Sequence, residues 1–195
     1  MTKIKFERKT NETRISIELL IDGRGKYSIS TPISFLNHML ELFARHGKFN
    51  LKLKADGDIN VDQHHLVEDI GIALGSAFDR ALGDRKGINR AGFFAMPMDE
   101  SLAILAIDIG GRPFFKFDVS FRNERIGDLS SELVYDFFQG FSNSLKCNLH
   151  IRSFEGRTDH HKAEAIFKAF GRALSMACSK NKKLKDYIPS TKGLI

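Results

Sequence analysis

The sequence contains no tryptophan and, among 195 residues, only four prolines and two cysteines. Cys147 and Cys178 show no CxxC spacing, which gives no sign of a zinc ribbon or a disulfide framework, so we expect two buried, reduced thiols. No apolar run approaches the roughly 18 residues that a membrane-spanning helix needs. The first residues also lack the apolar stretch of a secretory signal. These absences predict a cytoplasmic protein with no membrane partner.

What the chain does contain is enough apolar material for a sizeable core. Hydrophobic residues make up 42% of the sequence, and 17 residues are phenylalanine. The length lies in the usual range of one domain, so we expect a single domain over residues 1–195. The net charge of +6 would suit a nucleic acid, an anionic membrane surface or an acidic small substrate. Composition alone leaves these three alternatives open.

The most informative feature is a short motif that occurs twice. Residues 64–68 read His-His-Leu-Val-Glu, and 96 positions later residues 160–164 read His-His-Lys-Ala-Glu. In each copy the glutamate follows the first histidine by four positions and the second by three, so either pair can share one helix face. Adjacent helical residues point about 100° apart. One motif can therefore supply ligands to two different metal centres.

The similarity between the two copies extends beyond the motif. The same offset aligns four further identical pairs, Ile70 with Ile166, Ala73 with Ala169, Gly75 with Gly171 and Ala77 with Ala173. A repeat of roughly a hundred residues is too long for a solenoid unit. We therefore predict two similar halves, about residues 1–88 and 89–195, that form one compact body.

Apolar periodicity predicts the helices and strands of each half. Strands are expected at residues 13–21, 26–31, 49–55, 91–98, 101–108, 114–121 and 148–154, and helices at 33–45, 65–82, 131–146 and 161–180. Residues 22–25 predict a hairpin turn, and Asp62 and Asp159 are candidate caps for the helices that follow them. The order strand, strand, helix, strand, helix in each half predicts an α+β fold whose sheets are covered by helices.

The two motifs together indicate a metal site. Histidine and carboxylate without thiolate favour Mn, Fe, Co, Ni or Zn over a structural zinc site of the cysteine type, and the sequence alone does not rank these metals. Each motif is preceded by another ligand-type residue at a comparable distance. His38 lies 26 positions before His64, and Asp136 lies 24 positions before His160.

A set of motifs over residues 8–194 resembles the imidazoleglycerol-phosphate dehydratase family. The motifs are FLNHML at 35–40, RHG at 45–47, GD at 57–58, HHLVED at 64–69, MDE at 98–100, GRP at 111–113, GDL at 127–129, DHHKAE at 159–164 and PSTKG at 189–193. The resemblance implies a lyase of histidine biosynthesis that dehydrates D-erythro-imidazole glycerol phosphate to imidazole acetol phosphate. It also implies a duplicated fold like ribosomal protein S5 domain 2, two Mn²⁺ per active site, and 24-subunit particles with sites built from more than one subunit.

The resemblance assigns roles to individual residues of this chain. The implied metal ligands are His38, His64, His65, Glu68, Asp136, His160, His161 and Glu164. The implied substrate contacts are Glu12, His38, His46, Arg90, Arg112, Lys168, Ser190 and Lys192, among which the cationic residues would hold the phosphate. The residues expected to act in catalysis are Glu12, His65, Glu68 and Glu164.

Two positions depart from the family pattern. Asp136 stands where many relatives have histidine, and a carboxylate is shorter and adds negative charge, although it can ligate a divalent ion. Asn37 stands where many relatives have aspartate, which changes a group that could orient His38.

Two other functional classes fit part of the sequence. Paired histidine and carboxylate centres also activate water in two-metal phosphohydrolases. The positive charge and the S5-like fold would suit a nucleic-acid-binding protein, whose affinity would depend steeply on salt, but no RRM-type RNA-binding signature is present. The motif set favours the dehydratase, with a small phosphorylated substrate and no nucleic-acid partner.

Overall fold

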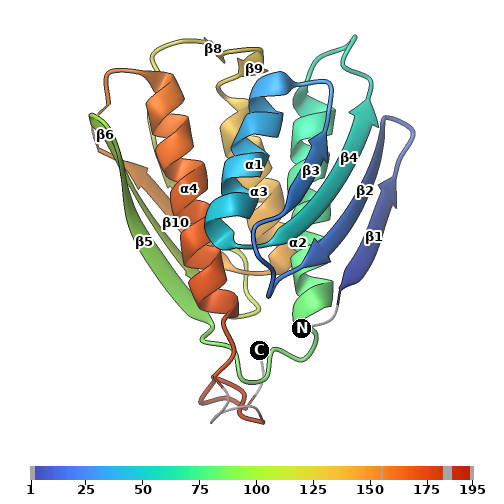
Figure 1. The fold of residues 1–195 in the computed structure, drawn as a ribbon, viewed down its shortest axis with the longest axis vertical. Helices are drawn as coiled ribbons and strands as arrows, with labels where there is room; N and C mark the ends of the chain where they lie inside the picture. Colours follow the sequence, from blue (N-terminus) through green and yellow to red (C-terminus); the bar gives the residue numbers. More distant parts are fainter. Residues whose placement is uncertain (1–2, 155, 182–185, 194–195) are drawn as a thin grey trace.

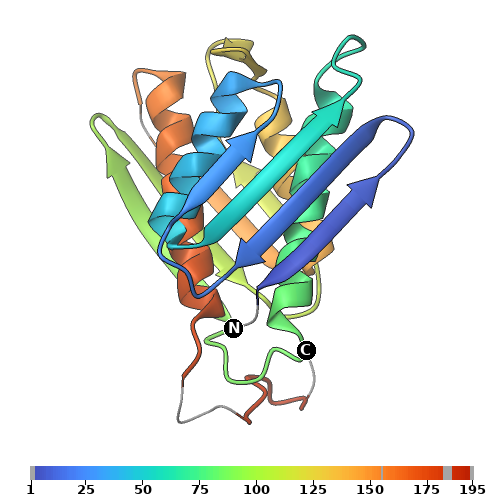
Figure 2. The ribbon, with the colours of Figure 1, turned by 45° about the vertical axis from the view of Figure 1, so that its right-hand side comes forward.

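The computed structural model describes residues 3–154, 156–181 and 186–193. In this part of the chain four helices lie between two four-stranded sheets, whose outer faces are left uncovered (Figure 1, Figure 2). In chain order the elements are β1 (Ile4–Lys9), β2 (Thr13–Leu20), β3 (Tyr27–Ser30), α1 (Ser34–Gly47), β4 (Asn50–Gly57), α2 (His64–Leu82), β5 (Ala91–Met98), β6 (Ser101–Asp108), β7 (Phe114–Asp118), β8 (Arg125–Ile126), β9 (Leu129–Ser130), α3 (Leu133–Leu145), β10 (Asn148–Ser153) and α4 (Asp159–Cys178).

The two halves of the chain have the same topology. The strand orders are β1-β2-β4-β3 in the first sheet and β5-β6-β10-β7 in the second. In each sheet the last pair, β4 with β3 or β10 with β7, is parallel, and the other pairs are antiparallel. This shared order confirms the predicted α+β fold with two similar halves.

Three details of the predicted elements are wrong. Strand β1 was not expected, because its sequence alternates only two apolar residues, Ile4 and Phe6, with charged residues at a sheet edge. Three strands of the four-stranded sheet therefore precede the first helix of each half. Residues 22–25 do not form a hairpin turn, because β4 lies between β2 and β3, and the segment connects two strands that do not pair. The β8–β9 ribbon was also missed, since its two-residue strands are too short to show periodicity.

The core lies in the helical layer and on the inner faces of the sheets. The strand β2 alternates buried and outward residues, as expected for a sheet with one covered face. In the centre, each helix contributes one phenylalanine to a closed set of ring contacts. Phe43 of α1 contacts Phe78 of α2 and Phe170 of α4, and Phe141 of α3 contacts both of these, at centroid separations of 4.6 to 6.1 Å.

Two glycines at equivalent repeat positions allow helices of different halves to approach closely. A Cβ on Gly75 of α2 would lie 2.6 Å from the carbonyl oxygen of Phe141 in α3. A Cβ on Gly171 of α4 would lie 2.5 Å from the carbonyl oxygen of Phe43 in α1. Both separations are too short for real atoms, so each helix pair requires glycine at this position.

The outer faces of the two sheets differ in chemistry although they share a topology. The β1–β2 hairpin of the first sheet can be aligned with the β5–β6 hairpin of the second by matching Thr13 with Ser101, the first residues of β2 and β6. The outward positions of the two hairpins are then equivalent. On the first sheet these positions hold Lys5, Glu7, Arg14, Ser16 and Glu18. On the second sheet they hold Phe93, Ala95, Leu102, Ile104 and Ala106, and the Phe93 side chain is 66% exposed. The β5–β6 hairpin of the second sheet thus presents an apolar outer surface, whereas β7 and β10 expose Lys116, Asp118 and Arg152 on the same sheet.

Within the described part of the chain, the helices are either too short or too polar to meet the requirements of a membrane span.

We expect neither cysteine to react with DTNB in the folded protein. Cys147 and Cys178 are buried, and burial raises the pKa of the Cys147 thiol to about 12 and that of Cys178 in the same direction. Both thiols therefore stay protonated and out of reach of the reagent. Thionitrobenzoate release should be absent until denaturant is added. Rapid release from the native protein would contradict this burial.

Candidate active site

The predicted metal ligands lie near the starts of the four helices. The two motifs open α2 and α4, Asp136 lies in the first turn of α3, and His38 directly follows the first turn of α1. His64 and His65 begin α2, and His160 and His161 lie in the first turn of α4. The Asp62 carboxylate accepts a hydrogen bond from the backbone N–H of His64 (2.7 Å), as predicted for a cap. The cap of α4 is instead Thr158, whose hydroxyl accepts from the N–H of His161 (3.2 Å).

Asp159 has a different role from the predicted helix cap. It is only 4% exposed, and its Oδ2 accepts from the backbone N–H groups of Arg122 and Asn123 and from the Asn123 side chain. Since it lies one residue inside α4, its side chain points to the loop after β7. Asp159 therefore fixes this loop beside the start of α4.

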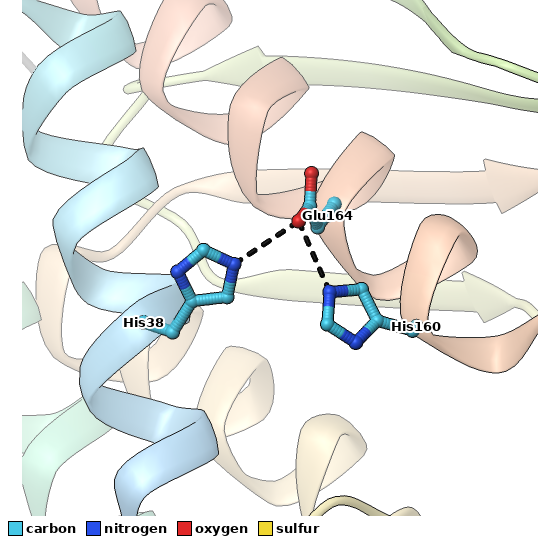
Figure 3. A group of neighbouring side chains, drawn as sticks. All are labelled: His38, His160 and Glu164. Carbon is cyan, nitrogen blue, oxygen red and sulfur yellow. Dashed lines mark hydrogen bonds and ion pairs between the residues drawn. The ribbon is translucent and has the colours of Figure 1, made fainter.

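Three predicted ligands from two different halves meet in one cluster, the His38 cluster. His38 of α1 and His160 of α4 both place Nε2 beside Oε1 of Glu164, at 3.0 and 3.1 Å (Figure 3). Their three ligand atoms lie within 4.8 Å of one another. The edge of the Phe35 ring packs against His160, with centroids 5.2 Å apart. This cluster offers two nitrogens and a carboxylate that converge on one point.

Glu164 is ionised at all ordinary pH values. Burial acts to raise its pKa, but hydrogen bonds from Lys168 and His38 outweigh burial and hold the pKa at about 2. Lys168 lies one helical turn further along α4, and its ammonium donates to Oε2 of Glu164 (2.5 Å). The carboxylate thus stays available as an anionic ligand.

A second cluster, the Asp136 cluster, occupies the equivalent place on the other helix pair. Oδ2 of Asp136 in α3 lies 3.6 Å from Nδ1 of His64, and Oε2 of Glu68 lies 4.0 Å from Nε2 of His64. Both contacts are longer than those of the His38 cluster. Burial raises the pKa of Asp136, while the nearby His64 opposes this rise.

The second histidine of each motif faces away from its cluster. The His64 and His65 rings lie at 75° to each other, and the His160 and His161 rings at 89°. Nδ1 of His65 lies 3.2 Å from Asp58 and 3.8 Å from Glu12. A single motif therefore presents its two imidazoles in different directions, as the helical spacing predicts.

On the other motif, Nδ1 of His161 lies 2.8 Å from Glu100, and its Nε2 lies 3.8 Å from Asp99. The hydrogen bond with His161 is the main reason that the pKa of Glu100 is lowered to about 2. Asp99, Glu100 and Asp58 were given no role by the sequence. A signal existed for one of them, since the alignment of the two hairpins makes Glu100 equivalent to Glu12.

The residues predicted to bind substrate fall into two groups. Lys168 lies beside the His38 cluster. His46 is half-buried near Lys168. Burial is the main cause that lowers the pKa of His46, and the positive charges of Lys168 and Arg172 lower it further. Glu12 lies in the β1–β2 turn, with a half-exposed carboxylate beside His65. These three residues lie within reach of the histidine motifs.

The other predicted phosphate ligands lie at the opposite end of the molecule, where both termini are found (Figure 1). The Arg90 side chain binds both oxygens of Asp108 and the carbonyl of Pro189, which precedes Ser190. Arg112 lies at the same end, since its carbonyl accepts from Asn148 at the start of β10, and Lys192 is exposed in the terminal segment.

The separation between the two ends can be measured along α4. The backbone N–H of Arg90 donates to the carbonyl of Ala177, which lies thirteen residues after Glu164. At about 1.5 Å per residue, the two positions are roughly 20 Å apart. One chain therefore does not bring the Arg90 group to the histidine clusters.

The β8–β9 ribbon joins the starts of α1 and α2. The Asp128 carboxylate accepts from the first N–H groups of α1, those of Ser34 (2.6 Å) and Phe35 (2.7 Å). Gln63, the residue before α2, donates to the carbonyl of Asp128 and accepts from the N–H of Ser130. The helices that carry His38 and His64 are thus fixed to the same ribbon.

The fold and the clusters define a class of protein. It is an internally duplicated α+β protein. Between its halves lie the compact His38 cluster and the looser contacts of the Asp136 cluster, and histidine with carboxylate is a donor set that suits divalent transition metals.

Known relatives identify the family within this class. Residues 31–174 match the family described as imidazoleglycerol-phosphate dehydratase. The sequence is 55% identical over 195 residues, the whole of both chains, to the imidazoleglycerol-phosphate dehydratase of Koribacter versatilis (strain Ellin345). It is 50% identical over 191 residues to that of Caldicellulosiruptor saccharolyticus (strain ATCC 43494 / DSM 8903 / Tp8T 6331), covering 98% of this chain and 97% of the relative.

Solved structures lead to the same conclusion. Imidazoleglycerol-phosphate dehydratase from Staphylococcus aureus superposes with a TM-score of 0.81 at 38% identity, covering 91% of this chain and 99% of the other. The Pyrococcus furiosus protein in complex with (S)-C348 gives 0.84 at 34% identity, covering 97% and 99%. The chain belongs to the imidazoleglycerol-phosphate dehydratase family, and it is a lyase of histidine biosynthesis.

Replacing Asp128 with alanine should destabilise the protein by about 1–2 kcal/mol, because two N–H groups at the start of α1 lose their acceptor. Asp128→Asn keeps one oxygen and should lose less. Urea unfolding followed by circular dichroism provides the measurement. Equal stability of wild type and Asp128→Ala would contradict the capping role.

Proposed function

We propose that this protein dehydrates D-erythro-imidazole glycerol phosphate to imidazole acetol phosphate, with two Mn²⁺ ions per active site. The single observation that carries the proposal is the pair of histidine–carboxylate clusters at equivalent positions of the two halves. The family of the chain provides the reaction. Buried, unpaired cysteines agree with a cytoplasmic location.

The residues present suit Mn²⁺ by their chemistry. The first ion would be held by His38, His160 and Glu164, and the second by His64, Glu68 and Asp136. His65 and His161 point outward from these clusters, so each would complete a centre on a neighbouring subunit. When bound, the ions act as Lewis acids toward the imidazole ring of the substrate and make loss of its side-chain hydroxyl easier.

The protein groups of the reaction are assigned by their exposure and contacts. Glu12 has a half-exposed carboxylate whose contact with His65 is 3.8 Å long, so it can turn toward a substrate. We assign to it the transfer of a proton at the leaving hydroxyl. Glu68 and Glu164 would act through the ions that their clusters hold, and His65 would help to orient the imidazole at the centre that it completes. His46 adds a further imidazole whose lowered pKa favours the neutral form.

The phosphate of the substrate would be bound by cations from a different subunit. Lys168 is near the clusters, whereas Arg90, Arg112, Ser190 and Lys192 lie roughly 20 Å or more away in the same chain, as the length of α4 indicates. Such groups can act on one substrate only if a second copy brings its own terminal segment to the clusters. This separation supports a site built from several subunits.

The apolar outer surface of the β5–β6 hairpin supports self-association. Phe93, Leu102 and Ile104 are exposed there, whereas the equivalent face of the first sheet is charged. A second copy of the chain is the proposed occupant, since the site itself needs other copies. We propose a homo-oligomer of 24 subunits.

Chelator-stripped, tag-free protein should form the keto product from imidazole glycerol phosphate only after Mn²⁺ is added. His65→Ala and His161→Ala should each lower kcat/KM by more than about 100-fold, which exceeds the usual effect of losing an outer metal-site partner. The measurement is product formation with and without Mn²⁺, after light scattering has verified that each variant keeps its assembly.

Release of inorganic phosphate without the keto product would instead indicate a phosphohydrolase. Full activity in the stripped protein, with no metal added, would contradict the role of the ions.

Replacing Ile104 with lysine should produce particles with fewer subunits than wild type, because a charge would be buried in the proposed interface. Ser16→Lys is the matched control, since Ser16 is the equivalent outward position on the charged sheet. Light scattering gives the mass of each. Unchanged mass in both variants would contradict an interface on the second sheet.

A further inference from the structure

The two motifs hold their second histidines through different elements. The alignment of the β1–β2 and β5–β6 hairpins makes Glu12 and Glu100 equivalent. The same alignment matches β4 with β10, because Leu51 pairs with Leu19 and Leu149 pairs with the equivalent Ile107. Asp58 lies directly after β4 and seven residues before His65, and Phe154 lies directly after β10 and seven residues before His161. Asp58 contacts His65 in the first half, whereas Glu100 contacts His161 in the second.

The second half has no carboxylate counterpart of Asp58, because the residue directly after β10 is the apolar Phe154. The acceptor for His161 comes from the hairpin turn instead, through the longer side chain of Glu100.

Glu100 is fixed on both sides. Its Oε1 accepts from the backbone N–H groups of Arg157 and Thr158, both at 3.0 Å, in the segment before α4. Its Oε2 is left to accept from Nδ1–H of His161 at 2.8 Å. This arrangement sets the direction of the carboxylate and places a proton on Nδ1, which leaves Nε2 of His161 as the basic nitrogen.

The equivalent residue Glu12 has no such constraint. In the described part of the chain its carboxylate makes only the 3.8 Å contact with His65, whose Nδ1 is already 3.2 Å from Asp58. Asp58 accepts side-chain hydrogen bonds from His65 alone among the described residues. The Asp58 carboxylate can therefore rotate, unlike that of Glu100.

We propose that Glu100 is a positioning residue that holds His161 in the tautomer with Nε2 available to a divalent metal, while Asp58 has taken this task in the first half and leaves Glu12 for the substrate. The proposal rests on the metal binding proposed above. Partners of this kind fix both the tautomer and the direction of a ligating imidazole.

Because both carboxylate oxygens of Glu100 accept hydrogen bonds, an amide at this position gives the proposal a specific test. In Glu100→Gln the amide oxygen is required by the N–H groups of Arg157 and Thr158, so the NH₂ group faces Nδ1 of His161. An amide donor at this place enforces the tautomer with the proton on Nε2, which cannot ligate a metal. Glu100→Ala removes the partner but allows either tautomer.

The experiment measures Mn²⁺ binding to chelator-stripped, assembled protein through the EPR signal of free Mn²⁺. Glu100→Gln should raise the Kd by about 10- to 100-fold, and by more than Glu100→Ala does. Asp58→Asn is the matched control, since its amide can rotate to keep oxygen toward His65, so a smaller change is expected. Glu12→Gln should leave the Kd unchanged.

A merely structural role for Glu100 predicts the opposite order, with the isosteric glutamine milder than alanine. That order, or an unchanged Kd in Glu100→Gln, would overturn the proposal. Because the readout is binding, it is separate from turnover: wild type that binds Mn²⁺ without forming product contradicts the proposed function, while the order of the variants still decides the role of Glu100.

Discussion

The structure depends on close packing between helices that come from different halves. α1 packs on α4 and α2 packs on α3, so each helix lies between the sheet of its own half and a helix of the other half. The glycines at positions 75 and 171 permit this approach, and the four central phenylalanines fill the space between the helix pairs. Both ligand clusters cross this contact, since His38 faces Glu164 and Asp136 faces His64. The duplication therefore yields a site only when the two halves are docked.

The repeated motif was sufficient to predict the duplicated fold and the different directions of the two histidines in each copy. Two copies of one sequence pattern must fold in the same way, and a helical spacing of three and four residues sets which side chains share a face. The confirmed parts of the fold therefore follow from local rules. The opposite directions of His160 and His161 follow from the same helical geometry.

Other features depend on contacts that no local pattern encodes. The position of β4 between β2 and β3 is set by pairing between strands, not by the residues that connect them. The turn-like residues 22–25 therefore led to a wrong prediction of a hairpin. The role of Asp159 depends on the loop after β7, which is distant in sequence. The contact of Glu100 with His161 became foreseeable only once the two hairpins had been aligned by their register.

The two clusters are equivalent in position but differ in charge. The His38 cluster has one carboxylate, and Lys168 donates to it. The Asp136 cluster has two carboxylates, and the residue equivalent to Lys168 is the uncharged Ile72. Because attraction of a cation grows with negative charge and oxygen ligands suit hard ions, a divalent cation is favoured at the Asp136 cluster. The raised pKa of Asp136 reflects the opposing effect of its burial. In the proposed second centre, Asp136 would therefore contribute negative charge through a short side chain.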